Sequence, residues 1–242
     1  HDKVVALLLA DPRVDPSVWN CAPLCRAASN GHDAVVALLL ADPRVHPACG
    51  TNTPIRWAAA CGHDTTVALL LADPRVDPSA ADNEAVREAV LFGHDATVAR
   101  LLADPRVNPA ADSNEAVQLA AEHGHIKTLT HLLADPRVDP TTEGNLAVRS
   151  AARWGYDTAV ALLLTDSRVR GALMTMAPLR VIYFPSPALI RLQAAIADER
   201  RWRRRRALAL VREQRRAARD HAPHGPWRGP SSSAAAGRCR VR

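Results

Sequence analysis

Length, composition and charge exclude several classes of protein. The chain has 242 residues, of which 48% are hydrophobic but only 4% aromatic, and its abundant Ala, Leu and Val suit closely packed helices. No apolar run approaches the roughly 20 residues of a membrane-spanning helix, because Arg180 and three prolines interrupt the most apolar stretch, 171–190. No signal peptide is visible, so we expect a cytoplasmic protein, or a nuclear one.

A tetrapeptide, Asp-Pro-Arg-Val, recurs every 31 residues from the start of the chain. It begins at Asp11, Asp42, Asp73, Asp104 and Asp135, with Asp166-Ser-Arg-Val as an altered sixth copy. Gly-His keeps the same spacing, and His1 holds the His position of such a pair, so we expect the first unit to be incomplete. A period of this length indicates stacked units that bury their apolar faces against one another and usually bind other macromolecules.

Each unit is predicted to contain two helices and a loop. In the fourth unit, apolar residues recur at helical spacing from Asn83-Glu84 until Gly93, which ends the run as a C-terminal glycine does. His94-Asp95 then opens a second helix with an apolar stripe, Val98, Leu101 and Leu102. Pro105 cannot continue that helix, so 106–109 form a short extended link with Val107 pointing into the stack.

At these motifs the chain resembles the ankyrin repeat family. The family's Thr-Pro-Leu-His opening corresponds to Thr53-Pro54-Ile55-Arg56, and its Gly-His segment is matched nearly in full by residues 27–40. The resemblance covers residues 1–171 and implies an all-α, ankyrin-like helix-turn-helix solenoid. The period is 31 rather than 33 residues, so we expect short, proline-stiffened loops in place of projecting β-hairpins. This Asp-Pro-Arg-Val variant is similar to repeats of amoebae and giant viruses, which implies a host-cell location if the chain is viral.

The charge changes sign after the repeats. Residues 1–171 carry a net charge of −6 and residues 172–242 carry +12. We expect 172–219 to form a helical C-terminal cap with a basic patch, in which Leu189, Leu192 and Ile196 share the apolar face. Residues 220–242 are rich in Pro, Gly, Ser and Ala and are predicted to be a disordered tail.

Metal and catalytic sites are not predicted. The repeated histidines His32, His63, His94 and His125 lie one unit apart, about 10 Å, which is too far to share an ion, and the resemblance implies that each holds the turn between helices. The five cysteines do not form paired Cys-x-x-Cys motifs and are expected to be reduced thiols. No phosphate-binding loop, His-Glu-x-x-His or Gly-x-Ser-x-Gly is present, so we expect neither catalysis nor a cofactor.

Partner binding is predicted on one face of the first helices. The resemblance places three positions of each first helix in the groove of the stack, and we call these fifteen residues the first-helix face. They are Arg26, Ser29 and Asn30; Trp57, Ala60 and Cys61; Glu88, Leu91 and Phe92; Leu119, Glu122 and His123; and Ser150, Arg153 and Trp154. Because aromatic residues are enriched in interface hot spots, the predicted partner-binding residues are Trp57, Phe92, Leu119, His123, Arg153 and Trp154. The alternative is that the rings pack over neighbouring helices.

The chain is therefore predicted to be a monomeric, non-enzymatic scaffold for another protein, with two alternatives. The run Arg200–Arg206, and within it Arg203, Arg204, Arg205 and Arg206, has the composition of a nuclear-import signal or a polyanion-binding site, although a basic cap is the simpler interpretation. Residues 184–190 resemble the start of the F-box-like helix of some viral ankyrin proteins, which suggests an adaptor for ubiquitin ligase machinery.

Overall fold

The structure is a computed structural model that describes residues 2–175, 187, 190, 194, 197–198, 201–202 and 204–211. The chain divides into two compact regions, His1–Ala194 and Ala195–Arg242. The N-terminal region contains the repeats, and the described residues of the C-terminal region are helical. All regular structure in the described ranges is helical, so the predicted all-α fold is confirmed and no β-hairpin projects from the described loops.

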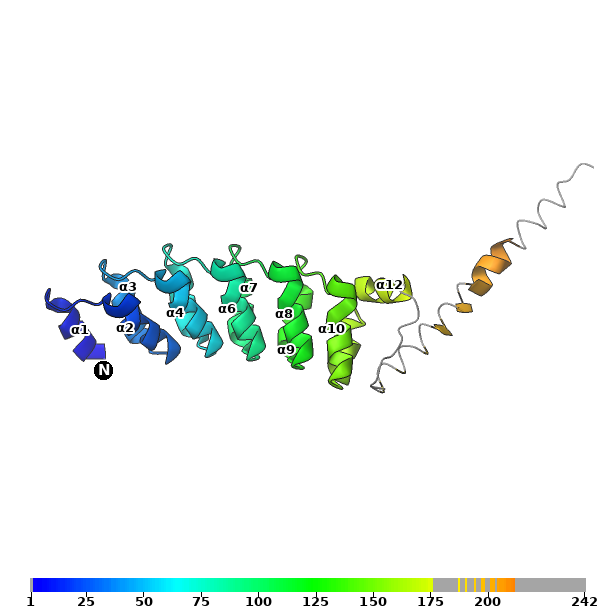
Figure 1. Cartoon of the computed structure of the whole chain (residues 1–242), viewed down its shortest axis with the longest axis horizontal. Helices are drawn as coiled ribbons and strands as arrows, with labels where there is room; N and C mark the ends of the chain where they lie inside the picture. Colours follow the sequence, from blue (N-terminus) through cyan, green and yellow to red (C-terminus); the bar gives the residue numbers. More distant parts are fainter. Residues whose placement is uncertain are drawn as a thin grey trace, which may run out of the picture. The chain divides into compact units, whose positions relative to one another are not determined.

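The repeats form two rows of helices. Successive first helices contact one another, successive second helices do the same, and each first helix contacts the second helix of its own unit. Figure 1 shows the first helices side by side in chain order, with the connecting loops along one edge. The first helices are α2 (Val18–Ser29), α4 (Cys49–Ala60), α6 (Ala80–Leu91), α8 (Ala111–Glu122) and α10 (Thr142–Arg153). The second helices are α1 (Asp2–Ala10), α3 (Asp33–Ala41), α5 (Asp64–Ala72), α7 (Asp95–Leu102), α9 (Ile126–Ala134) and α11 (Asp157–Leu163).

A left-handed turn precedes the right-handed part of every first helix. In α6 the backbone of Ala81, Asp82 and Asn83 has φ between 53° and 61°, and regular helical angles begin at Glu84, where the sequence predicts the start. The last residue of each such turn is buried, and in four of the five turns it is Asn: Asn52, Asn83, Asn114 and Asn145. Asn tolerates the left-handed region better than most residues with a Cβ, which explains its recurrence here.

The glycine of each Gly-His pair is fixed by two constraints. Gly93 has φ +72°, and a Cβ at this position would lie 2.6 Å from Nδ1 of His125, in the following unit. Only glycine meets both constraints without displacing the ring. The predicted helix end at Gly93 is therefore confirmed, and the reason for it includes close packing between units.

The core consists of small and branched apolar side chains at equivalent positions of each unit. Val98, Leu101 and Val107 are fully buried, as predicted for the second helix and its link. Leu102, the third residue of the predicted stripe, is only half-buried. Ala85, Val86, Ala89 and Val90 of α6 are buried as well, and their small volumes allow the two helices to pack closely.

The Asp-Pro-Arg-Val loop joins each unit to the preceding one. In the second unit, Asp42 accepts hydrogen bonds from the backbone N–H and the guanidinium of Arg44. The same guanidinium donates to the carbonyls of Val14, at 3.0 Å, and Leu9, at 2.9 Å, near the end of α1. Arg75, Arg106 and Arg137 repeat both contacts with the preceding unit, and Arg168 repeats the contact to the valine carbonyl. The recurring arginine therefore bonds a carbonyl at the C-terminus of the previous second helix and a carbonyl of the loop that follows it.

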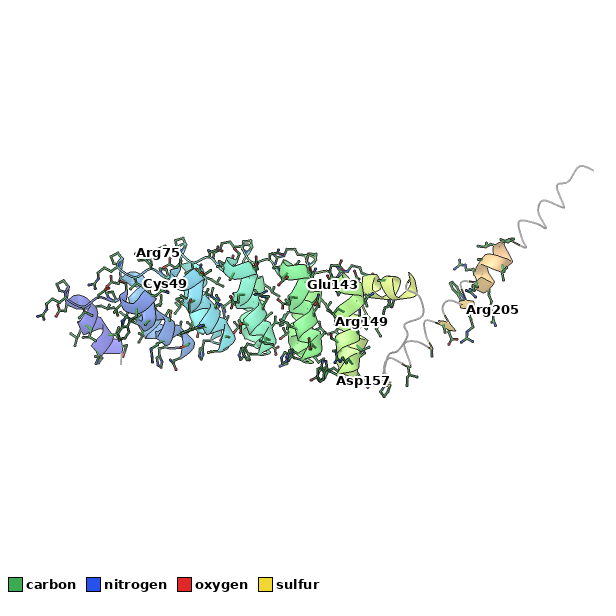
Figure 2. The ribbon with its side chains drawn as sticks, in the orientation of Figure 1. Cys49, Arg75, Glu143, Arg149, Asp157 and Arg205 are labelled. Carbon is green, nitrogen blue, oxygen red and sulfur yellow. The ribbon has the colours of Figure 1, made fainter. Side chains whose placement is uncertain are left out.

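The aspartate of this loop orients the arginine. Hydrogen bonds from the Arg44 guanidinium and backbone lower the pKa of Asp42 to about 2. The carboxylate is therefore ionised at neutral pH and holds Arg44 in the orientation that reaches the neighbouring carbonyls. Arg75 in the next unit lies along the loop edge of the array (Figure 2), where its side chain makes the same contacts.

Two further polar contacts recur along the array, one within units and one between them. Oδ1 of Asn83 accepts a hydrogen bond from the backbone N–H of Asn108, in the loop that ends the same unit, at 2.7 Å, and Asn52 and Asn114 accept the equivalent bond from the N–H of Asp77 and Asp139. Nε2 of His94 lies 2.9 Å from the carbonyl oxygen of Ala60, a contact that His63 and His125 also make with the preceding unit. The histidines therefore bridge units, in addition to beginning the second helices.

The structure describes the C-terminal prediction only in part. Helix α12 (Ser167–Thr175) begins inside the altered sixth copy of the loop motif and runs past the predicted end of the array at residue 171. Residues 176–186 and 212–242 lie outside the described residues, as do Leu189, Leu192 and Ile196 of the predicted apolar stripe. The helical cap and the disordered tail therefore stay predictions.

Candidate binding face

The residues of the first-helix face lie near the C-terminal ends of the five first helices. Its last row consists of the residues that end each helix, namely Asn30, Cys61, Phe92, His123 and Trp154, and all five are exposed. This row lies at the edge opposite the loops, which Figure 2 marks by Asp157 at the end of the array. The row begins where the glycine turn stops each helix, so the turn chemistry of the sequence fixes its position.

The aromatic residues of this face are not part of the core. The exposed fraction is 46% for Trp57 and 56% for both Phe92 and Trp154. The covered half of each ring is compatible with packing over a neighbouring helix, so that alternative stays open beside partner binding. Exposure of half of a large ring leaves enough apolar surface for contact with another molecule, while the covered half restricts its rotamers.

Histidine and arginine side chains extend the aromatic surface. The His123 and His125 rings stack with centroids 5.8 Å apart and an interplanar angle of 10°. Phe92 lies beside His94 with centroids 6.3 Å apart, and the guanidinium carbon of Arg153 lies 5.7 Å from the centre of the Trp154 ring. Leu119, the remaining predicted binding residue, is half-buried and offers part of its side chain to solvent. The six predicted binding residues thus lie on four consecutive first helices, α4 to α10.

The charges of this face are unevenly distributed. Arg26 lies on the first helix of the row and Arg153 on the last, and no Lys or Arg occupies a position of the face on the three helices between them. Those three helices carry Glu88 and Glu122, both half-exposed. Within the described structure, neither carboxylate has a hydrogen-bond or ion-pair partner. The sequence placed both glutamates on this face, but it did not show that they are unpaired, because that depends on where every cation points.

The possible metal ligands of the described residues are not clustered. No group of three or more His, Cys, Asp and Glu side chains in the described ranges lies close enough to hold a metal ion. Cys21, Cys25, Cys49 and Cys61 are free thiols, and Cys21 donates a hydrogen bond to the His46 carbonyl at 3.3 Å. Burial raises the pKa of the Cys25 and Cys49 thiols, which disfavours the thiolate that a metal or an electrophile would need.

The C-terminal region, Ala195–Arg242, carries the basic segment. Residues 201–202 and 204–211 are helical, Arg204, Arg205 and Arg206 are exposed, and Arg203 lies outside the described residues. The Arg206 guanidinium carbon lies 5.1 Å from the centre of the Trp202 ring, and Arg201 forms an ion pair with Asp198 at 2.9 Å. Figure 2 shows Arg205 pointing outward from this helix. Of the segment 184–190, the structure describes only residues 187 and 190, so the F-box-like interpretation has no structural support.

Paired helices joined by repeated side-chain-to-backbone contacts define a helical repeat protein. The ankyrin repeat model, described as "Ankyrin repeats (3 copies)", matches residues 1–82 and 86–172. The chain belongs to the ankyrin repeat family, whose members are usually non-catalytic and interact with other proteins. No curated protein matches the chain. No helix in the described ranges is both long and apolar enough to cross a membrane.

Sequence reasoning missed the side chains that join the units. It interpreted Asp-Pro-Arg-Val as a loop stiffener and gave no role to its arginine or to the buried asparagines. One signal was available, since a polar residue that recurs at the same position of nearly every unit indicates a repeated polar contact. The partners are backbone atoms of the preceding unit or of the following loop, which a sequence pattern does not identify.

Proposed function

We propose that the chain is a non-enzymatic scaffold that binds a partner protein on its first-helix face. The observation that carries the proposal is the exposure of Trp57, Phe92 and Trp154 on a surface whose underlying core positions are uniform small apolar residues. Half-covered aromatic rings are the residue type that dominates interface energetics. Leu119, His123 and Arg153 complete the proposed contact area.

Replacing Trp57, Phe92 and Trp154 with Ala is expected to abolish capture of the main partners while the array stays folded. Each ring is about half exposed, so its removal costs less folding free energy than removal of a core side chain, whereas a hot-spot ring contributes about 2 kcal/mol or more to binding. Affinity capture from a lysate of the source cells and thermal unfolding of the purified variant measure the two quantities.

Trp19 supplies a matched control for this experiment. It is also a tryptophan and is 86% exposed, but it lies in the left-handed turn at the opposite end of α2. Trp19→Ala is expected to leave partner capture unchanged. Capture that survives the triple substitution, or that is lost with Trp19→Ala alone, would contradict the assignment of the first-helix face.

A second candidate function is polyanion binding or nuclear import through the basic segment. The observation that favours it is the exposed cluster Arg204, Arg205 and Arg206 on one short helical stretch. Clustered guanidinium groups attract phosphates and sulfates, and this attraction weakens steeply as salt concentration rises.

Changing Arg203, Arg204, Arg205 and Arg206 to Gln tests this candidate. Gln retains length and helix propensity but removes the charge, so the repeats are expected to stay folded while heparin retention and nuclear accumulation are lost. Salt-dependent retention on heparin and the localisation of a fluorescent fusion are the measurements. If neither changes, the arginines have only the role of a polar cap.

A further inference from the structure

The centre of the first-helix face combines exposed aromatic rings with unpaired carboxylates. From this combination we infer that the face binds a basic segment of a partner protein, in which Arg or Lys side chains alternate with apolar ones. The inference rests on the proposed function and adds the chemistry of the partner to it.

The first argument concerns the cations of the central units. Every Arg and Lys between residues 49 and 134 is already engaged with an acidic side chain. The pairs are Arg56–Glu84, Arg75–Asp73, Arg87 with Asp112 and Glu115, Arg100–Asp64, Arg106–Asp104 and Lys127–Asp95. Glu88 and Glu122 remain without a cation in the described structure, although both are on the surface. Within these units no Arg or Lys remains to pair with the two glutamates, so a basic ligand offers the complementary charge, and charge complementarity of this kind selects partners.

The second argument concerns the order of rings and carboxylates. Trp57 on α4 occupies the same register position as Glu88 on α6, and Phe92 lies one turn after Glu88 on the same helix. Adjacent helices are about 10 Å apart, so a long side chain that meets a carboxylate also reaches a ring on the same or the next helix. An aromatic face and a carboxylate both attract a guanidinium or an ammonium group. The half-buried Leu91 and Leu119 supply the apolar contacts between these positions.

The third argument concerns the ends of the face. Arg26 and Arg153 place positive charge on the first and the last of the five helices, so the preference for cations is confined to α4, α6 and α8. A nucleic-acid backbone would bring phosphates toward Glu88 and Glu122 and would be repelled there. The face therefore fits a basic protein segment and not a nucleic acid.

Fluorescence anisotropy of the full chain with a labelled peptide of alternating Arg and Leu tests the inference. The variant Glu88→Gln/Glu122→Gln is expected to weaken binding about tenfold, since it removes two charges without changing side-chain shape. The matched variant Asp82→Asn/Glu143→Gln removes the same charge from exposed residues in the turns at the opposite ends of α6 and α10, and should weaken binding by less than about twofold.

A charge exchange provides the second arm. Glu88→Lys/Glu122→Lys should abolish binding of the Arg-Leu peptide and create binding of a Glu-Leu peptide. Thermal unfolding of each variant verifies that the array remains folded. If the lysine variant proved less stable, its binding of the Glu-Leu peptide would still support the inference. An unfolded variant would bind neither peptide.

Several outcomes would overturn the inference. If Glu88→Gln/Glu122→Gln and Asp82→Asn/Glu143→Gln weakened peptide binding equally, the net charge of the repeats, and not the first-helix face, would explain the attraction. Equal affinity for a Gln-Leu peptide would show that charge is not recognised. A large gain in peptide affinity on changing Arg204, Arg205 and Arg206 to Gln would assign the site to the chain's own basic segment. Partner capture that resists Glu88→Gln/Glu122→Gln but is lost with the aromatic substitutions would overturn this inference alone and leave the proposed function standing.

Discussion

Leu101→Ala is expected to lower the free energy of unfolding by about 2–5 kcal/mol, a large effect for a single substitution. Leu101 is fully buried at the centre of the stack, where helices of three successive units meet. Removing its side chain leaves a cavity that the surrounding backbone cannot fill, because the helices are tied to one another on both sides. Urea unfolding followed by circular dichroism measures the change.

Leu8→Ala is the matched control for this substitution. Leu8 holds the equivalent position in the first unit but is 50% exposed in the described structure, where α1 contacts α3. Its replacement is expected to cost less than about 1.5 kcal/mol. Equal losses at the two positions would mean that the apolar side of α1 is covered by another part of the protein.

Arg106→Gln is expected to destabilise the array by about 1–3 kcal/mol, although Arg106 is on the surface. The guanidinium donates hydrogen bonds to the carbonyls of Val76 and Leu71, both at 2.9 Å, and is held in place by Asp104. Gln is too short to make the two bonds together, so carbonyls at the end of α5 lose their partners. Thermal and urea unfolding measure the loss.

Arg13→Gln provides the comparison, because Arg13 is the same residue of the same motif. Among the described residues it bonds only to Asp11, with no carbonyl of an earlier unit within reach. An exposed ion pair of this kind contributes little, so the change is expected to stay within about 0.5 kcal/mol. A similar loss at both positions would show that the Asp-Arg pair, and not the contact between units, stabilises the loop.

The fold could be predicted from the sequence because local signals agree with one another. The 31-residue period, the glycine at the end of each first helix and the proline in each loop all bear on the same helix boundaries, and the structure has those boundaries. The ankyrin family assignment rests on the same repeated residues. The burial of individual side chains was harder to predict from the sequence. Leu101 and Leu102 are adjacent and identical in type, and only the position of the neighbouring helices decides which of them is buried.

The candidate site was predicted with less detail. The register of the repeats placed Trp57, Phe92 and Trp154 on one face, and the structure shows them exposed. The unpaired state of Glu88 and Glu122 could not be predicted, because it depends on which of several nearby acidic residues each arginine contacts. Arg87, for example, reaches forward to Asp112 and Glu115 instead of turning to Glu88, its neighbour in sequence.

The contacts between units bear on how such a chain changes over evolutionary time. Arg106 and His94 each reach out from their own unit to a backbone carbonyl of the preceding one, and every residue type supplies a backbone carbonyl. A duplicated unit inserted anywhere in the array would therefore find its docking partners without compensating substitutions. The number of units can vary by duplication or deletion of one 31-residue segment, while the residues of the first-helix face diversify independently.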